Sequence, residues 1–380
     1  MAAALVWVQH LLGSGHLRRA LSLAEALAAN GLRTTVASGG APMPWPVPAG
    51  VEIVQLPAAR AADNRIASLV DASGNPPDDG FWQARGRVLR ELVDHVCPAV
   101  IVTEMYPFGR RAFRHEVIAL LDHAAAVSAP LVVSSVRDVL VDKVRADRWQ
   151  EMRDVAVARC DLVLVHGDER LFPFERTFPH AAAIADRTVH TGFILAAVPN
   201  PADAGRCCVV VSAGGGAVGR GLIEAALAAR PLTVLSDRPW WLVAGANVPQ
   251  ADWDALGRAL PPDVRLVRHR DDLPDLIAAA EVSVSQAGYN TVVEGLAGGA
   301  RMVLVPFDAP GQDEQRLRAG RLAELGLAEV PTGDRLAPAT LAAAVDRAVA
   351  KPRPDASSFR FDGAARSAES ILAGLRRRAA

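Results

Sequence analysis

The stretch AAAEVSVSQAGYNTVVEGLAGGARMVLVPF, residues 278–307, predicts a strand, a tight turn, a helix and a second strand in direct succession. One apolar run ends in the small polar residues of SQAGYN, and a helical pattern follows before MVLVPF begins another apolar run. A strand that turns sharply into a helix exposes the bare N–H groups of the helix N-terminus. The question is whether these groups face a ligand or are capped by the chain itself.

The same succession of strand, loop and helix recurs along the whole sequence. Short apolar runs without alternation are typical of strands buried on both faces, and helices between them predict parallel sheets in an α/β fold. The predicted strands are 5–9, 34–38, 99–104, 131–136, 161–166, 207–212, 232–236, 264–269, 282–285 and 301–307. The predicted helices include 17–31, 110–125, 148–159, 338–350 and 365–378.

A segment rich in Pro, Ala and Gly, residues 194–206, interrupts this pattern near the middle of the chain. We therefore expect a Rossmann-like N-terminal domain over residues 1–195, a linker over 196–206 and a second Rossmann-like domain over 207–360. We expect the last helix, 361–380, to pack back on the first domain. In doubly wound sheets, ligands bind beyond the carboxyl ends of the strands, so a cleft between two such domains is the expected site.

The composition is that of an ordinary globular protein. The 380 residues include 51% hydrophobic residues, and 41 basic against 42 acidic residues give a net charge of −1, which does not suggest a nucleic-acid partner. The cysteines lack zinc spacing and indicate reduced thiols in a cytoplasmic protein. The N-terminus reads as neither a secretory signal nor a membrane span, although contact with a membrane surface stays open.

The segment SAGGGAVGRG, residues 212–221, contains a G-x-G-x-x-G motif between a predicted strand and a predicted helix. With Asp237 at the end of the predicted strand 232–236, this pattern would fit a dinucleotide site. A P-loop is excluded because Arg-Gly stands where Lys-Ser/Thr is required. The dinucleotide site and any other phosphate site at this turn have one feature in common, a helix N-terminus whose N–H groups suit a diphosphate.

The segment HLLGSGHLRR, residues 10–19, forms a second glycine turn, with Gly13 and Gly15, before a helix. Arg18 replaces the third glycine of a dinucleotide motif. His16 stands at the start of the helix, where the helix dipole favours the neutral imidazole and hence a base. Glu104 is the alternative at a neighbouring strand end, and further along stand Arg137 and Asp138, of which Asp138 is also a candidate base.

Two interpretations stay open for the helix that follows SQAGYN. Thr291 and Glu294 have the spacing of a capping box, in which the glutamate closes back on the helix start. Alternatively, the Glu294 carboxylate accepts hydrogen bonds from the paired hydroxyls of a ribose. Glu314 and Gln315, in the loop and helix start of residues 306–326, would suit the recognition of sugar hydroxyls.

Taken together, SAGGGAVG, LPDLIAAAEVSVSQAGYNTVVEGLAGG, MVLVPF and DEQRLRAGRLAELG resemble the C-terminal donor domain of GT-B glycosyltransferases of family 28, typified by the peptidoglycan N-acetylglucosaminyltransferase. The loop GSGHLRR is similar to the N-terminal glycine loop of that group. The first half, with TEMYPFGRRAFRHE, VSSVRD and VLVHGDE, resembles a less characterised bacterial branch of predicted glycosyltransferases. The loop lacks the extra glycines of the peptidoglycan enzyme, which speaks against a lipid-linked peptidoglycan acceptor.

The resemblance implies a GT-B fold, with two Rossmann-like domains facing each other across a cleft, and assigns roles to residues. Donor binding would involve Ser212, Gly214, Gly215, Gly216, Arg268, His269, Ser285, Gly288, Asn290, Thr291, Glu294, Glu314 and Gln315. The glycines would hold the diphosphate, Glu294 the ribose, and Glu314 and Gln315 the sugar. His16 would occupy the place of a candidate base, and Gly13, Gly15 and Arg137 would lie on the acceptor side.

The predicted activity is transfer of a sugar from a nucleoside diphosphate, with uridine favoured by the resemblance, to an acceptor hydroxyl or amine. No Asp-x-Asp signature accompanies the donor motifs, so we expect an inverting reaction without a metal or other cofactor. A nucleotide-sugar hydrolase would use the same donor site. An NAD(P)-dependent oxidoreductase is the more distant alternative, since it leaves Glu294 unexplained.

Overall fold

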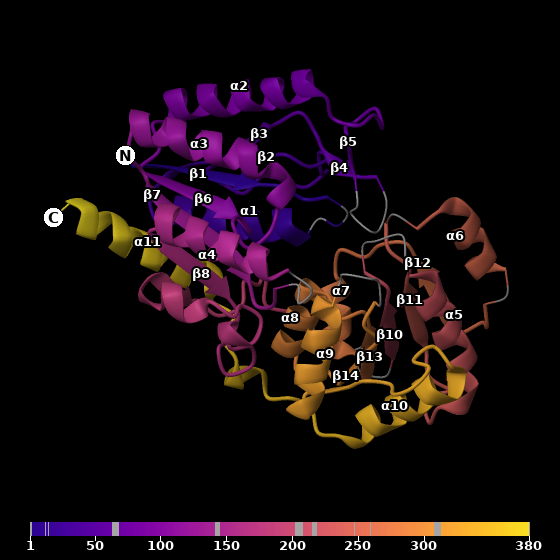
Figure 1. Cartoon of the computed structure of the whole chain (residues 1–380). Coiled ribbons are helices and arrows are strands. Elements are labelled where there is room, and N and C mark those ends of the chain that lie inside the picture. Colours follow the sequence, from indigo (N-terminus) through magenta and orange to yellow (C-terminus); the bar gives the residue numbers. More distant parts are fainter. Residues whose placement is uncertain are drawn as a thin grey trace. The chain divides into compact units, whose positions relative to one another are not determined.

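The computed structural model describes residues 2–11, 13, 15–62, 68–140, 145–201, 208–214, 219–246, 248–258, 260–307 and 313–379. By its internal contacts the chain divides into two compact units (Figure 1). Unit 1 contains Met1–Ala196 and Arg360–Ala380, and unit 2 contains Ala197–Phe359. The chain thus leaves unit 1, forms unit 2 and returns with its last helix to unit 1.

The core of unit 1 is a parallel sheet with the strand order β3-β2-β1-β6-β7-β8-β9. The strands are β1 (Ala3–Val8), β2 (Arg33–Ser38), β3 (Val51–Gln55), β6 (Val100–Glu104), β7 (Leu131–Arg137), β8 (Leu162–His166) and β9 (Thr188–His190). A small antiparallel pair, β4 (Arg60–Ala61) and β5 (Leu69–Val70), lies outside this sheet. The strands β1, β6 and β8 are buried throughout, as their continuous apolar runs predict.

Helices cover both faces of this sheet (Figure 1). On one face, α1 (Gly15–Ala29) and α11 (Gly363–Ala379) pack together over β1 and β8. On the other face lie α2 (Asp79–Val96) and α3 (Arg114–Val127), and α4 (Ala146–Arg159) packs with the short 3₁₀ helices Phe174–Arg176 and Ala181–Arg187. The apolar positions of α1, such as Leu17, Leu21 and Leu27, are those that face the sheet.

Unit 2 repeats the architecture with the strand order β12-β11-β10-β13-β14-β15, again parallel. The strands are β10 (Val209–Ser212), β11 (Trp240–Val243), β12 (Val264–Val267), β13 (Val282–Ser285), β14 (Met302–Leu304) and β15 (Ala328–Glu329). The helices are α5 (Arg220–Ala229), α6 (Gln250–Gly257), α7 (Leu273–Ala279), α8 (Tyr289–Ala297), α9 (Glu314–Glu324) and α10 (Pro338–Ala350). The side chains of α5 and α10 share a core with β10, β11 and β13.

One glycine of the motif between β10 and α5 is required by packing. A Cβ placed on Gly219, the residue before α5, would lie 2.1 Å from the Cβ of Ala213, a distance that real Cβ atoms do not reach. The close approach of the helix start to the strand end therefore needs a glycine at this position. Gly214 in the same loop has a φ of +73°, in the left-handed region that favours glycine.

The predicted strand 232–236 is wrong. These residues form the end of a 3₁₀ helix (Arg230–Leu232) and turns, and the strand is Trp240–Val243 instead. The strand begins with two Trp residues, directly after Pro239. The Val and Leu of residues 232–236 have the composition of a strand, and the prediction therefore set the strand several residues too early. The helix predicted over 110–125 begins later, at Arg114, after a 3₁₀ turn over Arg111–Phe113.

The correction of this strand removes the basis of the dinucleotide interpretation. Asp237 stands three residues before β11, at the amino end of the strand, and its side chain is 79% exposed. A ribose-binding acid has to stand at the carboxyl end, beside the glycine turn. Asp237 therefore cannot complete a dinucleotide site with Gly214 and Gly219.

No helix in the described part of the chain is long and apolar enough to cross a membrane.

Candidate functional site

The strand order of unit 1 reverses between β1 and β6, which are neighbours although they are far apart in sequence. At such a switch point the connections leave in opposite directions and open a crevice at the carboxyl ends of the two strands. Gln9 and His10 follow β1 there, and Glu104 ends β6. The loop after β1 leads directly into α1, which begins at Gly15 and carries His16 as its second residue.

His16 and Glu104 meet at this switch point. The Nδ1 atom of His16 lies 2.9 Å from Oε1 of Glu104. The guanidinium of Arg19, one turn further along α1, donates to the same oxygen. Glu104 and Arg19 are buried, whereas the side chain of His16 keeps 19% of its surface exposed.

The charges around this pair determine which nitrogen of His16 carries the proton. Burial would raise the pKa of Glu104, but the neighbouring His16 and Arg19 outweigh it and hold the pKa of the carboxyl well below its usual range. Burial, together with the charge of Arg110, lowers the pKa of His16 to about 3. An ionised carboxylate only accepts hydrogen bonds, so the contact with Glu104 favours the tautomer that carries the proton on Nδ1 and the lone pair on Nε2. Nη2 of Arg19, which only donates, lies 3.1 Å from the same Nδ1 and favours the other tautomer.

Two further polar atoms close to this pair lack a hydrogen-bond partner among the described residues. They are Oε2 of Glu104 and Nε2 of His10, and both are buried. Burial, followed by the charge of Arg110, lowers the pKa of His10. A buried polar atom without a partner is costly unless water or a ligand reaches it, so these atoms mark a place that accepts a polar group.

A buried ion pair supports the strand ends behind this crevice. Arg85 of α2 is fully buried and contacts the carboxylate of Glu116 in α3, with Nη2 donating to Oε1 at 2.8 Å. The same guanidinium donates to the carbonyl of Gly39 (3.1 Å) and to Oε1 of Gln9 (3.0 Å). It thereby connects the carboxyl ends of β1 and β2 to the helices on one face of the sheet.

The remaining acceptor-side residues of the sequence prediction lie at the same edge of unit 1. Arg137 ends β7, and the buried Asp138 follows it, with Oδ1 accepting a hydrogen bond from the N–H of Val139 at 2.9 Å. This local contact occupies one oxygen of Asp138, whereas Glu104 contacts the imidazole directly. Gly13 is exposed, and Gly15 begins α1.

The strand order of unit 2 reverses between β10 and β13, and the two polar turns of the sequence meet there. Ser212 and Ser285 are paired at the carboxyl ends of these strands, both almost fully buried. The hydroxyl of Ser285 has no hydrogen-bond partner within the described ranges. Gly214 follows β10, whereas Gly215 and Gly216 lie outside the described residues.

Of the two interpretations of α8, the structure excludes the capping box. The helix begins at Tyr289 with Gly288 as its N-cap, and no side chain caps it. Thr291 is therefore already inside the helix, and Glu294 is too far along to reach the first N–H groups. A Cβ on Gly288 would meet no atom of the described residues within 4 Å, so none of them fills the space beside the helix N-terminus.

Asn290, Thr291 and Glu294 share one face of α8, because residues three and four apart are neighbours on a helix. All three are partly exposed, whereas Tyr289, Val292, Val293 and Leu296 are buried on the other side. The polar face of α8 thus begins at the switch point between β10 and β13.

Gln315 has a structural contact that the sequence does not predict. It follows Glu314 at the start of α9, and its Oε1 accepts hydrogen bonds from the N–H groups of Ala287 and Phe307, each at 3.0 Å. The side chain oxygen therefore ties together the loops after β13 and β14. Only its amide nitrogen is left for a role in reading a sugar.

Arg268 and His269 follow β12, the edge strand two places from β10. The carbonyl of Arg268 accepts from the N–H of Gly245 at 3.0 Å, and its guanidinium lies 4.6 Å above the ring of Trp253. The His269 side chain is largely exposed, with Nε2 3.0 Å from Asp271. The guanidinium of Arg268 also donates to the carbonyl of Val248 at 2.8 Å, so both main chain and side chain hold this strand end, whereas the imidazole of His269 is exposed.

The sequence patterns did not identify several residues that contact or surround His16, Glu104 and the strand ends of unit 1. Arg19 could have been found, because it stands three residues after His16 and therefore on the same helix face. Arg85, Glu116 and Arg110 show no local signal. Within the described ranges, no group of three or more His, Cys, Asp or Glu side chains could hold a metal ion.

Comparison with known proteins finds a family match for the C-terminal part of the chain and solved structures with a similar fold. Residues 211–369 match the C-terminal domain of glycosyltransferase family 28. A curated relative from Burkholderia cenocepacia, UDP-N-acetylglucosamine–N-acetylmuramyl-(pentapeptide) pyrophosphoryl-undecaprenol N-acetylglucosamine transferase, is 39% identical over 79 residues, 21% of this chain and 22% of its own. The enzyme of that name from Nitrosococcus oceani is 37% identical over 90 residues, 24% and 25% of the two chains. The chain thus spans only about a quarter of the length of these relatives.

Solved structures cover the chain almost completely at low identity. MurG from Acinetobacter baumannii has a TM-score of 0.62 and 15% identity, covering 98% of this chain and 99% of its own. The calicheamicin glycosyltransferase CalG4 has a TM-score of 0.61 and 19% identity, covering 100% and 96%. At this identity the likeness concerns the fold, and it confirms the predicted GT-B architecture of two Rossmann-like domains.

Proposed function

We propose that the chain, which has the GT-B fold and matches the family 28 C-terminal domain over residues 211–369, is a glycosyltransferase that uses a nucleoside diphosphate sugar, with UDP as the carrier. The observation that carries this proposal is the family 28 domain over residues 211–369, whose switch point holds a glycine turn and the starts of two helices. The relatives named as UDP-N-acetylglucosamine transferases favour uridine over other bases. The acceptor offers a hydroxyl or an amine.

In the proposed donor site, the diphosphate lies at the N-termini of α5 and α8, next to Ser212 and Gly214. The free N–H groups at the start of α5 and α8 and the dipoles of these two helices favour the binding of an anion. As the glycosidic bond breaks, negative charge grows on the diphosphate, and these fixed dipoles stabilise it without needing a metal ion. Glu294, on the polar face of the same α8, accepts hydrogen bonds from the ribose hydroxyls.

The proposed base is His16. Its Nε2 takes the proton of the acceptor hydroxyl while the oxygen attacks the anomeric carbon and the bond to the diphosphate breaks, which inverts that carbon. Glu104 holds the Nδ1 proton and stabilises the imidazolium that forms, and Arg19 keeps Glu104 ionised. Glu104 is thus the partner of the base in this scheme.

We predict that Glu294→Ala abolishes nucleotide-dependent stabilisation. With UDP, dTDP and GDP each at about 100 times its dissociation constant, the wild type should gain about 2.7 kcal/mol with one of them, and the variant should not. Differential scanning fluorimetry measures this. NAD and NADP complete the panel, and Glu324→Ala, an exposed glutamate of α9, is the matched control.

The result separates the alternatives. A shift that survives in Glu294→Ala would exclude this residue as the ribose ligand, and a shift with NAD alone would overturn the assignment of a sugar nucleotide. Hydrolysis is distinguished in a second step, by comparing free sugar with the released nucleoside diphosphate. Equal amounts in the presence of acceptors would mean that water is the acceptor and that the protein is a hydrolase.

A further inference from the structure

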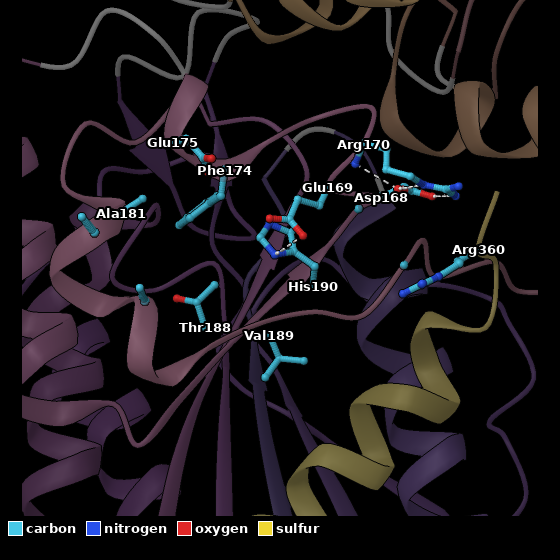
Figure 2. Close-up of a pocket in the computed structure, with 14 residues that line it drawn as sticks. Asp168, Glu169, Arg170, Phe174, Glu175, Ala181, Thr188, Val189, His190 and Arg360 are labelled. Atoms are coloured by element: carbon cyan, nitrogen blue, oxygen red, sulfur yellow. Dashed lines mark hydrogen bonds and ion pairs between the residues drawn. The ribbon is translucent and has the colours of Figure 1, made fainter. Parts of the chain in front are cut away.

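Unit 1 contains a pocket that lies apart from the His16–Glu104 pair. Its volume is about 720 Å³, and it is formed by residues 167–175, by residues 181–192 and by Arg360 (Figure 2). The pocket runs beside β9, the edge strand of the sheet, and reaches the turns after β8 and β9. The volume is in the range of pockets that hold small organic molecules.

Part of the wall is apolar. Phe174 is buried in the core of unit 1 and contributes to the pocket, together with Val189 of β9 and Ala181. Ala182 and Ala185, exposed on the 3₁₀ helix before β9, form part of the rim. Such a surface gains free energy when it covers the apolar body of a ligand.

The charges at the mouth are unevenly matched. Arg170 is held by Asp168, with Nε and Nη2 donating to the two carboxylate oxygens at 3.0 and 2.6 Å. Arg360 lies in the segment that leads into α11. No side-chain hydrogen bond of Arg360 is seen within the described ranges, but its charge acts on the carboxylate of Asp168. Figure 2 shows its side chain extending toward the pocket. The lining also contains the carboxylates of Glu169 and Glu175, so a negative group is favoured only next to Arg360, whose N–H donors it can take up.

His190 adds hydrogen-bonding groups in the middle of the wall. Its Nδ1 is 4.0 Å from Oε2 of Glu169, and its Nε2 is buried without a hydrogen-bond partner in the described ranges. The N–H of Thr191 donates to Val165 of β8 at 3.0 Å. Because successive residues of a strand alternate, the N–H and C=O of His190 point away from β8, toward the open edge.

We propose that this pocket binds a small molecule with an apolar body and one negatively charged group, the apolar body against Phe174 and Val189 and the charge at Arg360. If the proposed glycosyltransferase function holds, this molecule is the acceptor. Parallel strands lie about 4.8 Å apart, so β9 is about 14 Å from β6 and Glu104 along the same sheet, a distance that one small molecule can span.

Hydrogen bonds and strand pairing connect the pocket beside β9 with Glu104 at the end of β6. At the end of β8, His166 lies 2.7 Å from the hydroxyl of Ser135, the sheet partner of Glu104, and 2.9 Å from the hydroxyl of Thr191, next to His190. Burial lowers the pKa of His166 to about 3, so this imidazole is neutral and connects its two hydroxyl neighbours. A ligand in the pocket therefore contacts a segment that is connected to the end of β6, which carries Glu104, the partner of the proposed base.

The test uses two fluorescent probes of similar shape, 8-anilinonaphthalene-1-sulfonate and the uncharged N-phenyl-1-naphthylamine. We expect Arg360→Gln to weaken binding of the sulfonate about fivefold or more and to change binding of the neutral probe less than twofold, because only the charge contact is lost. Ala185→Trp fills the rim and should weaken both probes. Arg153→Gln, an exposed arginine of α4, is the control.

Equal losses of both probes in Arg360→Gln, or no loss of either, would overturn the assignment of a negative group. Unchanged binding in Ala185→Trp would overturn the pocket itself. UDP binding is measured on the same samples. A failure of the probes with intact UDP binding contradicts this inference alone, whereas absent nucleotide binding contradicts the proposed function.

Discussion

We expect the His16→Ala variant to lose about 10²–10⁴ of kcat, the contribution that a positioned general base makes. Its dissociation constant for the nucleoside diphosphate should stay within about twofold of the wild type, because the proposed donor contacts are all in unit 2. The change removes the only nitrogen in the proposed scheme that takes the acceptor proton. Steady-state kinetics with the donor identified by the nucleotide panel, combined with equilibrium binding of the diphosphate, measure both quantities.

The exposed pair of His123 and Asp94 provides the matched control. Their atoms are 2.7 Å apart, as in a catalytic pair, but both side chains lie on the surface of unit 1. His123→Ala should therefore leave kcat unchanged. Full activity of His16→Ala would exclude this residue as the base and return the role to Asp138 or to another group.

The pH dependence gives an independent readout of the same residue. A base acts in its neutral form, which is present above its pKa and lost as the pH falls through it. Because the pKa of His16 is lowered to about 3, kcat/KM should change less than about twofold between pH 5.5 and 7.5 on account of this group. A histidine with an ordinary pKa of about 6.5 would lose about tenfold at the acidic end. A loss of that size would show that His16 is solvated and not held as described.

The two switch points explain how much of the site could be predicted from the sequence. Glycine turns before helices and polar residues after apolar runs are local signals. They located Glu104, Ser212 and Ser285 at strand ends and His16 at the start of a helix. That Glu104 faces His16 depends on β6 lying next to β1, a pairing between strands about 95 residues apart for which the sequence has no local signal.

The excluded capping alternative and the wrong strand prediction have a common cause. The capping box at Thr291 and Glu294 has the right spacing, but the turn from β13 delivers Gly288 as the N-cap, three residues earlier. The strand predicted over 232–236 has the right residue types, but β11 pairs with β10 only from Trp240 onward. In both cases the tertiary pairing overrides a pattern that is correct in itself. Arg85 and Glu116 are 31 residues apart in the sequence, in two different helices, and come into contact only in the folded unit.

We expect Arg85→Met to destabilise unit 1 by about 3–5 kcal/mol, the range measured when one partner of a buried ion pair is removed. The substitution leaves the carboxylate of Glu116 in the interior with only the indole N–H of Trp7, at 2.8 Å, among the contacts that the structure gives. It also takes a donor away from the carbonyls of Gly39 and Pro57. Hydrogen exchange of unit 1 peptides under increasing urea measures the loss separately from unit 2.

Two further variants distinguish a lost ion pair from a general intolerance of the substitution. Arg111→Met removes an arginine that pairs with Glu151 on the surface of unit 1, at 2.9 Å, and should cost less than about 0.5 kcal/mol because exposed pairs contribute little. The double variant Arg85→Met/Glu116→Leu removes both charges and should be less destabilised than Arg85→Met alone. If the double variant is worse, the carbonyl contacts of Arg85 and not its ion pair hold the strand ends. The guanidinium would then matter as a hydrogen-bond donor that ties the loops after β1 and β2 to the helix layer.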